Sequence, residues 1–442
     1  MKPPSLHRWR TACIGLGFAV MVVSALAQEP RGHAWEDRGG YRVARLPAAP
    51  PGQTGFSSLT PAATGITFSN YLPDIHSVSN LNLENGSGIA LGDYDGDGLC
   101  DIYFCNLAGT NALYRNLGGW RFREVTAEAG VACPGQFSTG AVFADVNGDG
   151  ALDLLVTSMG GPNACFLNDG RGRFTNVTAQ AGLVSKWGAS SMGLADVDGN
   201  GTLDLYVANY GLSSILHFGG QISVSYVNGK PVVRGRHAQR IKIIDGIMYE
   251  FGEPDTLWLN DGRGRFNSVP WTGGAFLQSD GSKLAAEPWD QGLSVLVRDL
   301  NGDGRPDIYV CNDALTPDRL WINQGGGRFQ AAQPLALRHM SYFSMGADAA
   351  DVDRDGHDDL FVLDMMSRQH RLRLTQKSPM RAEPVRPGVF TTSRKSAATP
   401  CTTRAATAPT RTSPTLPAWP PPSGRGARCS STWISTAGKI CS

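Results

Sequence analysis

Short apolar segments alternate with acidic, glycine-rich segments along most of this chain, and the alternation is repetitive. Each of five repeats contains an apolar strand, an acidic loop, a second apolar strand and then a hairpin. This pattern predicts four short antiparallel strands per repeat. A sheet of that size cannot bury both faces alone, so successive sheets should pack on one another. We therefore predict an all-β fold, a β-propeller of four-stranded blades, with a stacked solenoid as the alternative.

The repeats are evenly spaced except for the third. Consecutive acidic loops begin 52, 51, 103 and 52 residues apart. The hairpin of the third repeat, Leu257 to Phe266, is delayed by about 40 residues relative to the others. An insertion at about 210–253 explains most of this delay. A shorter stretch of extra residues follows at 273–290.

Every acidic loop follows the pattern D-x-[DN]-x-[DN]-G-x-x-D. Oxygens at positions 1, 3, 5 and 9, with a backbone carbonyl at position 7, can converge on one hard cation if the glycine at position 6 permits a sharp turn. Oxygen ligands from a flexible loop favour calcium over zinc, copper or magnesium. One such loop could be a solvated acidic turn, but five indicate about five calcium (Ca²⁺) sites. The predicted ligands are Asp93, Asp95, Asp97, Leu99, Asp101, Asp145, Asn147, Asp149, Ala151, Asp153, Asp196, Asp198, Asn200, Thr202, Asp204, Asp299, Asn301, Asp303, Arg305, Asp307, Asp351, Asp353, Asp355, His357 and Asp359.

The first 27 residues have the pattern of a secretory signal peptide. Lys2, Arg8 and Arg10 precede an apolar run at 11–23, and small residues lead up to Ala27. Cleavage after Ala27 would give a secreted protein, extracellular or periplasmic. An uncleaved anchor is the alternative, but this run is shorter than the roughly 20 residues that span a bilayer. A flexible segment at 28–53 should follow, and no membrane span is expected.

Composition and charge narrow the class of partner. The content of Gly 54 and Pro 27 with 18% charged residues is typical of many short strands and tight turns. Lys+Arg 40 against Asp+Glu 39 provides no global field for a polyanion, so no nucleic-acid partner is expected. Outside the signal and the tail, the cysteines show no metal-ligand spacing. Five cysteines remain, namely Cys100, Cys105, Cys133, Cys165 and Cys311. Either Cys100 and Cys105 form a disulfide bridge, or these residues are buried free thiols.

The loops and their strand contexts resemble FG-GAP/VCBS repeats, the units of integrin α-subunit propellers. Within that group the chain is similar to the cartilage-acidic-protein family, through the segments Glu84 to Gly88 and Phe343 to Gly346. The resemblance covers about 55–380. It implies a seven-bladed propeller, calcium at the loops, and binding or adhesion without catalytic residues. The C-terminal ASPIC/UnbV segment of that family is missing here.

The composition changes after about residue 393 to Ala, Thr, Pro, Arg and Ser, which is typical of a disordered tail. Back-translation of 429–442, read one base earlier, permits the string VFLDVDLDGWEDLL, which would be a sixth acidic loop. We therefore expect a frameshift from about 393, with a genuine disordered tail as the alternative. The predicted organisation is a signal at 1–27, a flexible segment at 28–53, an incomplete propeller at 54–380 and the tail at 381–442.

Two surface features were weighed as partner sites. The long insertion is the better candidate, with a decorative folded-back hairpin as the alternative. It carries Lys230, Arg234, Arg236, His237, Arg240 and Lys242. Tryptophans could stack on sugars, but their positions in successive repeats favour core between blades, and no ligand is assigned to Trp187, Trp258, Trp271, Trp289 and Trp321.

These features predict a secreted, monomeric calcium-binding protein whose partner is an extracellular protein or glycan. The alternative is a calcium-dependent polysaccharide lyase or hydrolase, for which no nucleophile motif, zinc triad or phosphate loop is found. An unpaired carboxylate such as Glu250 or Asp290 beside His237 could supply acid–base chemistry, and only the tertiary structure decides whether one lies there. A purely structural matrix component is a third reading.

Overall fold

The computed structural model describes residues 56–218, 222–244, 246–313, 316–337, 339–352 and 355–365, with five short strands outside these ranges. The chain forms two units, 1–58 and 59–442. In the first unit, β1 (Trp35–Asp37) pairs antiparallel with β2 (Arg42–Ala44). The predicted signal peptide and its cleavage point lie outside the described residues, as does the rest of the segment predicted to be flexible.

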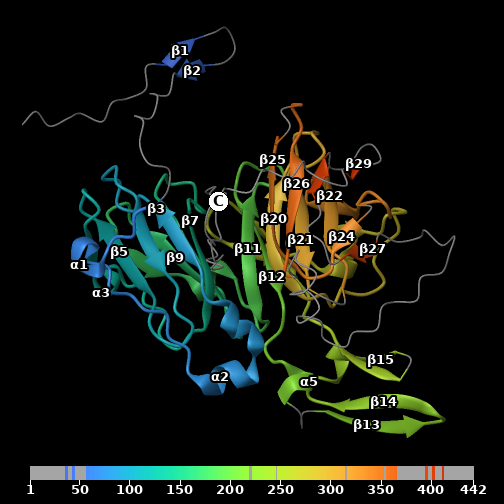
Figure 1. Cartoon of the computed structure of the whole chain (residues 1–442). Coiled ribbons are helices and arrows are strands. Elements are labelled where there is room, and N and C mark those ends of the chain that lie inside the picture. The colour runs from blue at the N-terminus through green and yellow to red at the C-terminus, as the bar shows by residue number, and fades with distance from the viewer. Residues whose placement is uncertain are drawn as a thin grey trace, which may run out of the picture. The chain divides into compact units, whose positions relative to one another are not determined.

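The second unit contains five sheets of four or five strands, one for each repeat of the sequence (Figure 1). The first consists of β3 (Ile89–Gly92), β4 (Asp101–Phe104), β5 (Ala112–Asn116) and β6 (Phe122–Glu124). The second consists of β7 (Ser138–Ala144), β8 (Asp153–Ser158), β9 (Ala164–Asn168) and β10 (Phe174–Asn176). The third consists of β11 (Ala189–Ala195), β12 (Asp204–Asn209), β17 (Thr256–Asn260) and β18 (Phe266–Ser268).

The last two sheets vary this plan. The fourth consists of β20 (Gly292–Arg298), β21 (Asp307–Asn312), β22 (Arg319–Gly325) and β23 (Arg328–Ala331), and β19 (Phe276–Leu277) adds parallel to β23. The fifth consists of β25 (Ser344–Ala350), β26 (Asp359–Asp364), β28 (Cys401–Thr403) and β29 (Arg411–Thr412). Beside them β24 (His339–Ser341) pairs with β27 (Arg394–Ser396).

Helices are few and short. They are α1 (Pro61–Thr64), α2 (Asp74–Ser79), α3 (Thr126–Ala129), α4 (Thr178–Ala181) and α5 (Ile215–Phe218), with 3-10 turns at Leu81–Asn85, Ala238–Arg240 and Trp271–Gly273. Among the described residues, none of these helices has the length and apolarity needed to cross a membrane.

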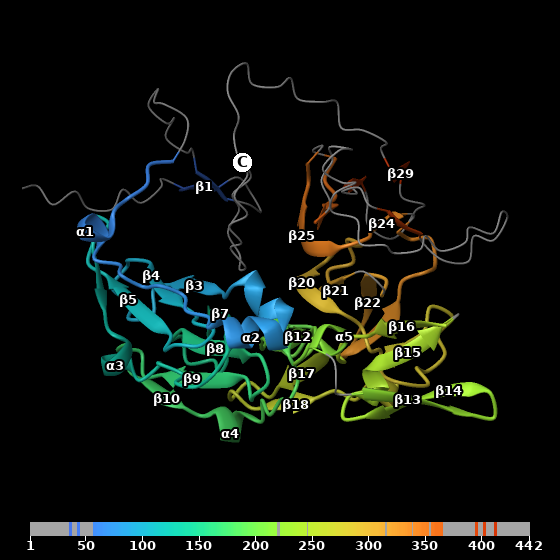
Figure 2. The same ribbon diagram turned by 60° about the horizontal axis from the view of Figure 1, so that its bottom comes forward.

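Successive sheets pack on one another through their first strands, in the order β3, β7, β11, β20 and β25. Figure 2 shows the sheets following one another along the chain. A separate apolar cluster fills each of the four junctions between neighbouring sheets. This is blade-on-blade packing, in which each sheet buries both faces only against its neighbours. The all-β, blade-like architecture predicted from the repeat is confirmed.

Alternation along the second strand of each sheet shows which face meets which neighbour. The residue two positions after the aspartate that begins this strand faces the following sheet in the first four sheets. These residues are at most 2% exposed, and they are Tyr103, Leu155, Tyr206 and Tyr309. The equivalent residue of the fifth sheet, Phe361, is 37% exposed. Because alternate residues point to opposite faces, the fifth sheet lacks a covering neighbour on this side within the described part of the chain.

The predicted tail contains the short strands β27, β28 and β29, and its other residues lie outside the described ranges. The predicted frameshift therefore stays a prediction. All five of the cysteines considered above are free thiols, with Cys100 exposed and the other four buried. The Cys100–Cys105 bridge is therefore wrong, and the reading as free thiols describes the structure.

Candidate calcium loops and the opposite end of the sheets

Each acidic loop is the turn that joins the first strand of a sheet to its second. The residue at position 9 begins the second strand and is buried, as for Asp101 and Asp153, while positions 3 to 7 reach the surface. Glycine at positions 4 and 6 has a left-handed backbone, with φ of 73° at Gly96 and 84° at Gly98. Residues with a Cβ atom rarely adopt this backbone conformation, so glycine permits the sharp turn.

Backbone amides hold the first carboxylate of each loop in place. In the first loop, Asp93 accepts hydrogen bonds from the N–H groups of Asp97 at 3.0 Å and Gly98 at 2.8 Å. The other four loops show the same bonds at positions 5 and 6. These bonds fix the first carboxylate of each loop within the turn.

The first and third loops each bring three carboxylates together. One oxygen from each of Asp93, Asp95 and Asp101 lies within 4.8 Å of the others, and Asp196, Asp198 and Asp204 repeat this arrangement. In the first loop, Oδ1 of Asp95 is buried and has no hydrogen-bond partner. A carboxylate oxygen without a partner beside two further carboxylates fits a hard cation such as calcium. The donor set is therefore suited to the ion that the sequence predicted.

The second and fourth loops carry asparagine instead of aspartate at position 3. In the second loop, Nδ2 of Asn147 donates to Asp149 at 2.9 Å, and Asn301 bonds Asp303 in the same way in the fourth. Asp353, predicted as a ligand in the fifth loop, lies outside the described residues. The carbonyl contributions predicted at position 7 stay predictions.

Burial raises the pKa of the carboxyl group at position 9. The pKa of Asp101, Asp153, Asp204 and Asp307 rises to about 6, and two backbone N–H groups at each carboxylate only partly oppose the rise. In the first loop, burial also raises the pKa of Asp95. A divalent cation beside these groups would favour their ionised form, which is the form that ligates.

Arginine side chains lie beside predicted ligands in two loops, and in the fourth loop Arg305 lies 2.6 Å from Asp303. The guanidinium of Arg115, from β5, lies 2.6 Å from Asp95 and 2.9 Å from Asp97. The equivalent residues in the next three sheets are Leu167, Leu259 and Ile322. The first loop therefore carries a protein cation that competes for two of its predicted ligands.

Sequence reasoning missed an asparagine that links each of the first three loops to the next sheet. Nδ2 of Asn168 donates to the carbonyl of Tyr94, at position 2 of the preceding loop, at 2.7 Å. Asn260 and Asn323 make the same bond at 2.8 and 2.9 Å, and each also bonds the loop of its own sheet. The recurrence of this asparagine near the end of the third strand of successive sheets was the signal available in the sequence.

Comparison with known proteins agrees with this geometry. A family model described as an FG-GAP-like repeat matches residues 93–156, 145–207 and 299–362, which include all five acidic loops. The chain carries FG-GAP-like repeats. Cartilage acidic protein 1 of Mus musculus is 25% identical over 247 residues, which are 55% of this chain and 31% of the relative. The Xenopus tropicalis protein of that name is 32% identical over 124 residues, 26% of this chain and 19% of the relative.

The chain thus matches about a third or less of the length of these curated relatives. Among solved structures, an Agrocybe aegerita lectin that recognises non-reducing terminal N-acetylglucosamine has a TM-score of 0.33 at 19% identity, covering 62% of this chain and 59% of the lectin. The V. cholerae biofilm matrix protein Bap1 has a TM-score of 0.30 at 16% identity, covering 62% and 34%. The predicted resemblance to FG-GAP repeats and to cartilage acidic proteins is confirmed.

The insertion of the third FG-GAP-like repeat follows β12 and therefore leaves the sheet at the end opposite the acidic loops. It contains two hairpins, β13 (Ile222–Val227) with β14 (Lys230–Gly235), and β15 (Ile241–Ile244) with β16 (Ile247–Glu250). Lys230, Arg234 and Arg236 are exposed. Lys242 places its ammonium group 4.4 Å from the ring centre of Phe251.

Arg240 is an anchor of the insertion and not a surface contact. It is 1% exposed, bonds Glu250 at 3.0 Å and lies 3.6 Å from Glu253. It also donates to the carbonyls of Phe251 and Ser213. The prediction that placed Arg240 among the partner-binding residues is therefore wrong, because a buried, fully bonded guanidinium cannot reach a ligand.

The carboxylates considered for catalysis are engaged in structural contacts. Glu250 pairs with Arg240 and accepts hydrogen bonds from the N–H groups of Ile215 and Leu216 at 2.9 Å each. Asp290 forms a two-point ion pair with Arg319 at 2.7 and 3.2 Å. Neither is an unpaired carboxylate beside His237, so this route to acid–base chemistry is wrong.

The tryptophans divide into two groups. Trp258, Trp271 and Trp321 are buried in the clusters between sheets, as predicted. Trp187 and Trp289 are only partly buried, with ring centres 5.9 Å apart and planes at 81°. This pair therefore lies between the third and fourth sheets, as predicted, but remains partly exposed.

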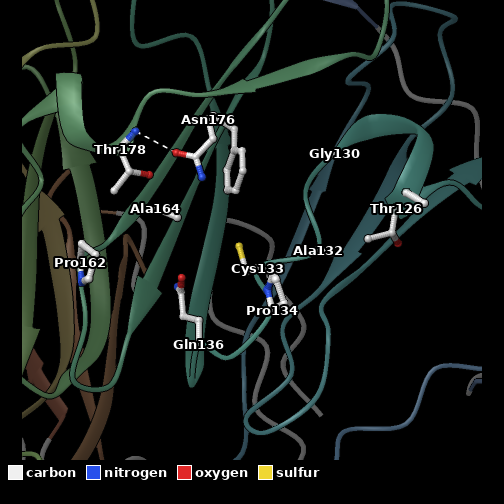
Figure 3. Close-up of a pocket in the computed structure, with 12 residues that line it drawn as sticks. Thr126, Gly130, Ala132, Cys133, Pro134, Gln136, Pro162, Ala164, Asn176 and Thr178 are labelled. Carbon is white, nitrogen blue, oxygen red and sulfur yellow. Dashed lines mark hydrogen bonds between the residues drawn. The ribbon is translucent and has the colours of Figure 1, made fainter.

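A depression of about 520 Å³ lies between the first two repeats, at the end of the sheets opposite the acidic loops (Figure 3). Its lining includes Cys133, Pro134, Gln136, Asn176 and Thr178, and Asn176 accepts a hydrogen bond from the N–H of Thr178 at 3.0 Å. No charged side chain lines it. It therefore provides no acid–base pair.

Asp255 occupies a place that two other repeats fill with asparagine. Its carboxylate accepts hydrogen bonds from the hydroxyl of Tyr206 at 2.9 Å and the N–H of Asn209 at 2.8 Å. Asn111 and Asn163 accept the equivalent backbone bond in the first and second sheets. Burial raises the pKa of Asp255 to about 7.

This raised pKa predicts that the free energy of unfolding depends on pH, and that Asp255→Asn removes this dependence. Because the folded-state pKa lies above the unfolded value near 4, the associated stability is present at low pH and is lost as pH rises through about 7. From pH 5 to pH 8, the free energy of unfolding of the wild type should fall relative to Asp255→Asn, on the order of 3 kcal/mol. Urea melts in saturating calcium measure this difference. Asp261→Asn, at an exposed turn, is the control, and a constant difference for Asp255→Asn would contradict the assignment.

Proposed function

We propose that this protein is a secreted calcium-binding β-propeller that binds an extracellular protein or glycan, with calcium in a structural role. The observation that carries the calcium assignment is the convergence of three carboxylates in the first and third loops, one of them with an unpartnered buried oxygen. The side chains at positions 1, 3, 5 and 9 would hold the ion. Bound there, calcium would offset the repulsion between carboxylates that the fold brings together.

The contacts around the loops indicate how bound calcium would affect the packing of the sheets. Asn168, Asn260 and Asn323 connect each loop to the neighbouring sheet through a single side chain. Ordering a loop therefore also orders the junction that it contacts. Calcium would in this way stabilise the packing of repeats and leave the opposite end of the sheets for partners.

Two observations support extracellular binding. The repeats belong to the FG-GAP-like class and the chain is related to cartilage acidic protein 1. The N-terminal pattern of the sequence is that of a signal peptide. Long loops on a rigid scaffold are common binding elements, and the third repeat carries one with exposed cationic residues.

Calcium titration tests the assignment. Calorimetry of chelator-treated protein should give about five sites, and Asp196→Asn should reduce the number by one because it removes a first ligand. Asp261→Asn, which alters an exposed carboxylate of the hairpin in the same repeat, should leave the number unchanged. Equal affinity for magnesium, or no binding heat with calcium, would contradict the proposal.

A further inference from the structure

Trp187 and Trp289 form a partly exposed aromatic pair at the end of the sheets opposite the acidic loops. Trp187 lies just before β11 and Trp289 just before β20, whereas the acidic loops follow these strands. Both indoles lack a hydrogen-bond acceptor within the described residues. Their polar edges are therefore available to a ligand, in contrast to Trp271, whose indole N–H donates to the carbonyl of Asp255 at 2.8 Å.

A cleft of about 470 Å³ adjoins this pair. One wall is Trp187, and apolar groups of Pro254, Val269 and Pro270 line other parts. The hydroxyl-bearing residues Thr256, Ser268 and Thr272 also line it, together with the exposed Glu287. This size, with apolar walls and a few polar groups, is typical of small-molecule sites.

Two exposed charged residues at the cleft, Glu287 and Lys186, form no ion pair within the described residues. The ammonium group of Lys186 lies 4.6 Å from the centre of the Trp187 ring. One acceptor and one donor thus flank an aromatic surface. Lys186 is exposed and its long side chain can move aside for a ligand or donate to it.

The base of the insertion holds the two tryptophan loops in position. Glu253 accepts hydrogen bonds from the N–H of Gly188, beside Trp187, at 2.7 Å and of Leu212 at 3.2 Å. Gln291, two residues after Trp289, donates to the carbonyl of Glu250 at 3.2 Å. A site held by such contacts loses less conformational entropy when a ligand binds.

We propose that this cleft binds a neutral sugar unit of a glycan, with the sugar packed on Trp187. The proposal rests on the proposed function as an extracellular binding protein and names the ligand class. A sugar ring has an apolar C–H face and a rim of hydroxyl groups, which match an aromatic ring bordered by an indole N–H, a carboxylate and hydroxyls. The carboxylate of Glu287 disfavours uronate or sulfated sugars because of like-charge repulsion.

Calorimetric titration of the full chain in calcium with cellohexaose, chitohexaose and mannohexaose tests this proposal. At least one hexaose should bind, Trp187→Ala should weaken its affinity at least tenfold, and Glu287→Gln should weaken it severalfold. Trp187→Phe should retain part of the affinity because it keeps an aromatic face. Trp120→Ala, which removes a tryptophan that is 72% exposed in the first repeat, is the matched control and should bind as the wild type.

The outcomes separate this proposal from the proposed function. Calcium stoichiometry is measured on the same samples, and melting curves establish that each variant is folded. Normal calcium binding without binding of any of the three hexaoses overturns the cleft proposal alone, as does full affinity in Trp187→Ala. Sedimentation that shows self-association, lost in Trp187→Ala, would also overturn it by assigning the cleft to a second copy.

Discussion

Removal of calcium is expected to lower the melting temperature by about 14–28 °C. With free calcium tenfold above the dissociation constant, each independent site stabilises the fold by roughly 1.4 kcal/mol, so five sites contribute about 7 kcal/mol. For a domain of this size, each kcal/mol shifts the midpoint by roughly 2–4 °C. Scanning calorimetry with and without excess chelator measures the shift.

Two controls make this experiment specific. Restoring calcium in excess of chelator should restore the midpoint, and the Asp196→Asn variant should show a smaller chelator effect than the wild type. A midpoint that chelator does not change would contradict the calcium assignment for all loops. An equal effect in Asp196→Asn would contradict it for the third loop.

Arg240→Ala is expected to destabilise the protein by about 3–5 kcal/mol. The substitution removes the cation that compensates Glu250 and Glu253 and leaves two largely buried carboxylates without it. It also removes donors from two backbone carbonyls of the insertion. Urea denaturation followed by far-ultraviolet circular dichroism measures the change in the free energy of unfolding.

The neighbouring arginine provides the matched control. Arg236 is exposed and forms no ion pair within the described residues, so Arg236→Ala should change stability by less than about 0.5 kcal/mol. Equal stability of the two variants would contradict the role of Arg240 as the anchor. A change confined to the insertion, with the sheets unaffected, would show that the anchor acts locally.

Much of the fold could be predicted because the repeat expresses local rules. Asp and Gly at fixed positions specify the same turn five times, and the apolar segments on each side alternate with the period of a strand. The all-β sheets and the position of every acidic loop follow from this. The same pattern indicated that Trp258 and Trp321 lie between sheets, where the structure places them.

Other features depend on contacts between distant residues and could not be read from local pattern. Arg240 looked like a surface cation among others, and only its position beside Glu250 and Glu253 shows that it is buried. Trp289 occurs in a loop like that of Trp187, but their contact requires the packing of the third sheet on the fourth. The asparagine bonds between sheets join residues up to 126 positions apart.

The sequence by itself determined the repeat, the strands, and the positions and residue types of the acidic loops, because each depends on residues within about ten positions of one another. Only the tertiary structure decided which carboxylates converge, which cation is buried and which tryptophans remain accessible. The physical reason is that burial and pairing are properties of the junctions between sheets. There, a side chain's partner is set by how whole repeats pack on one another.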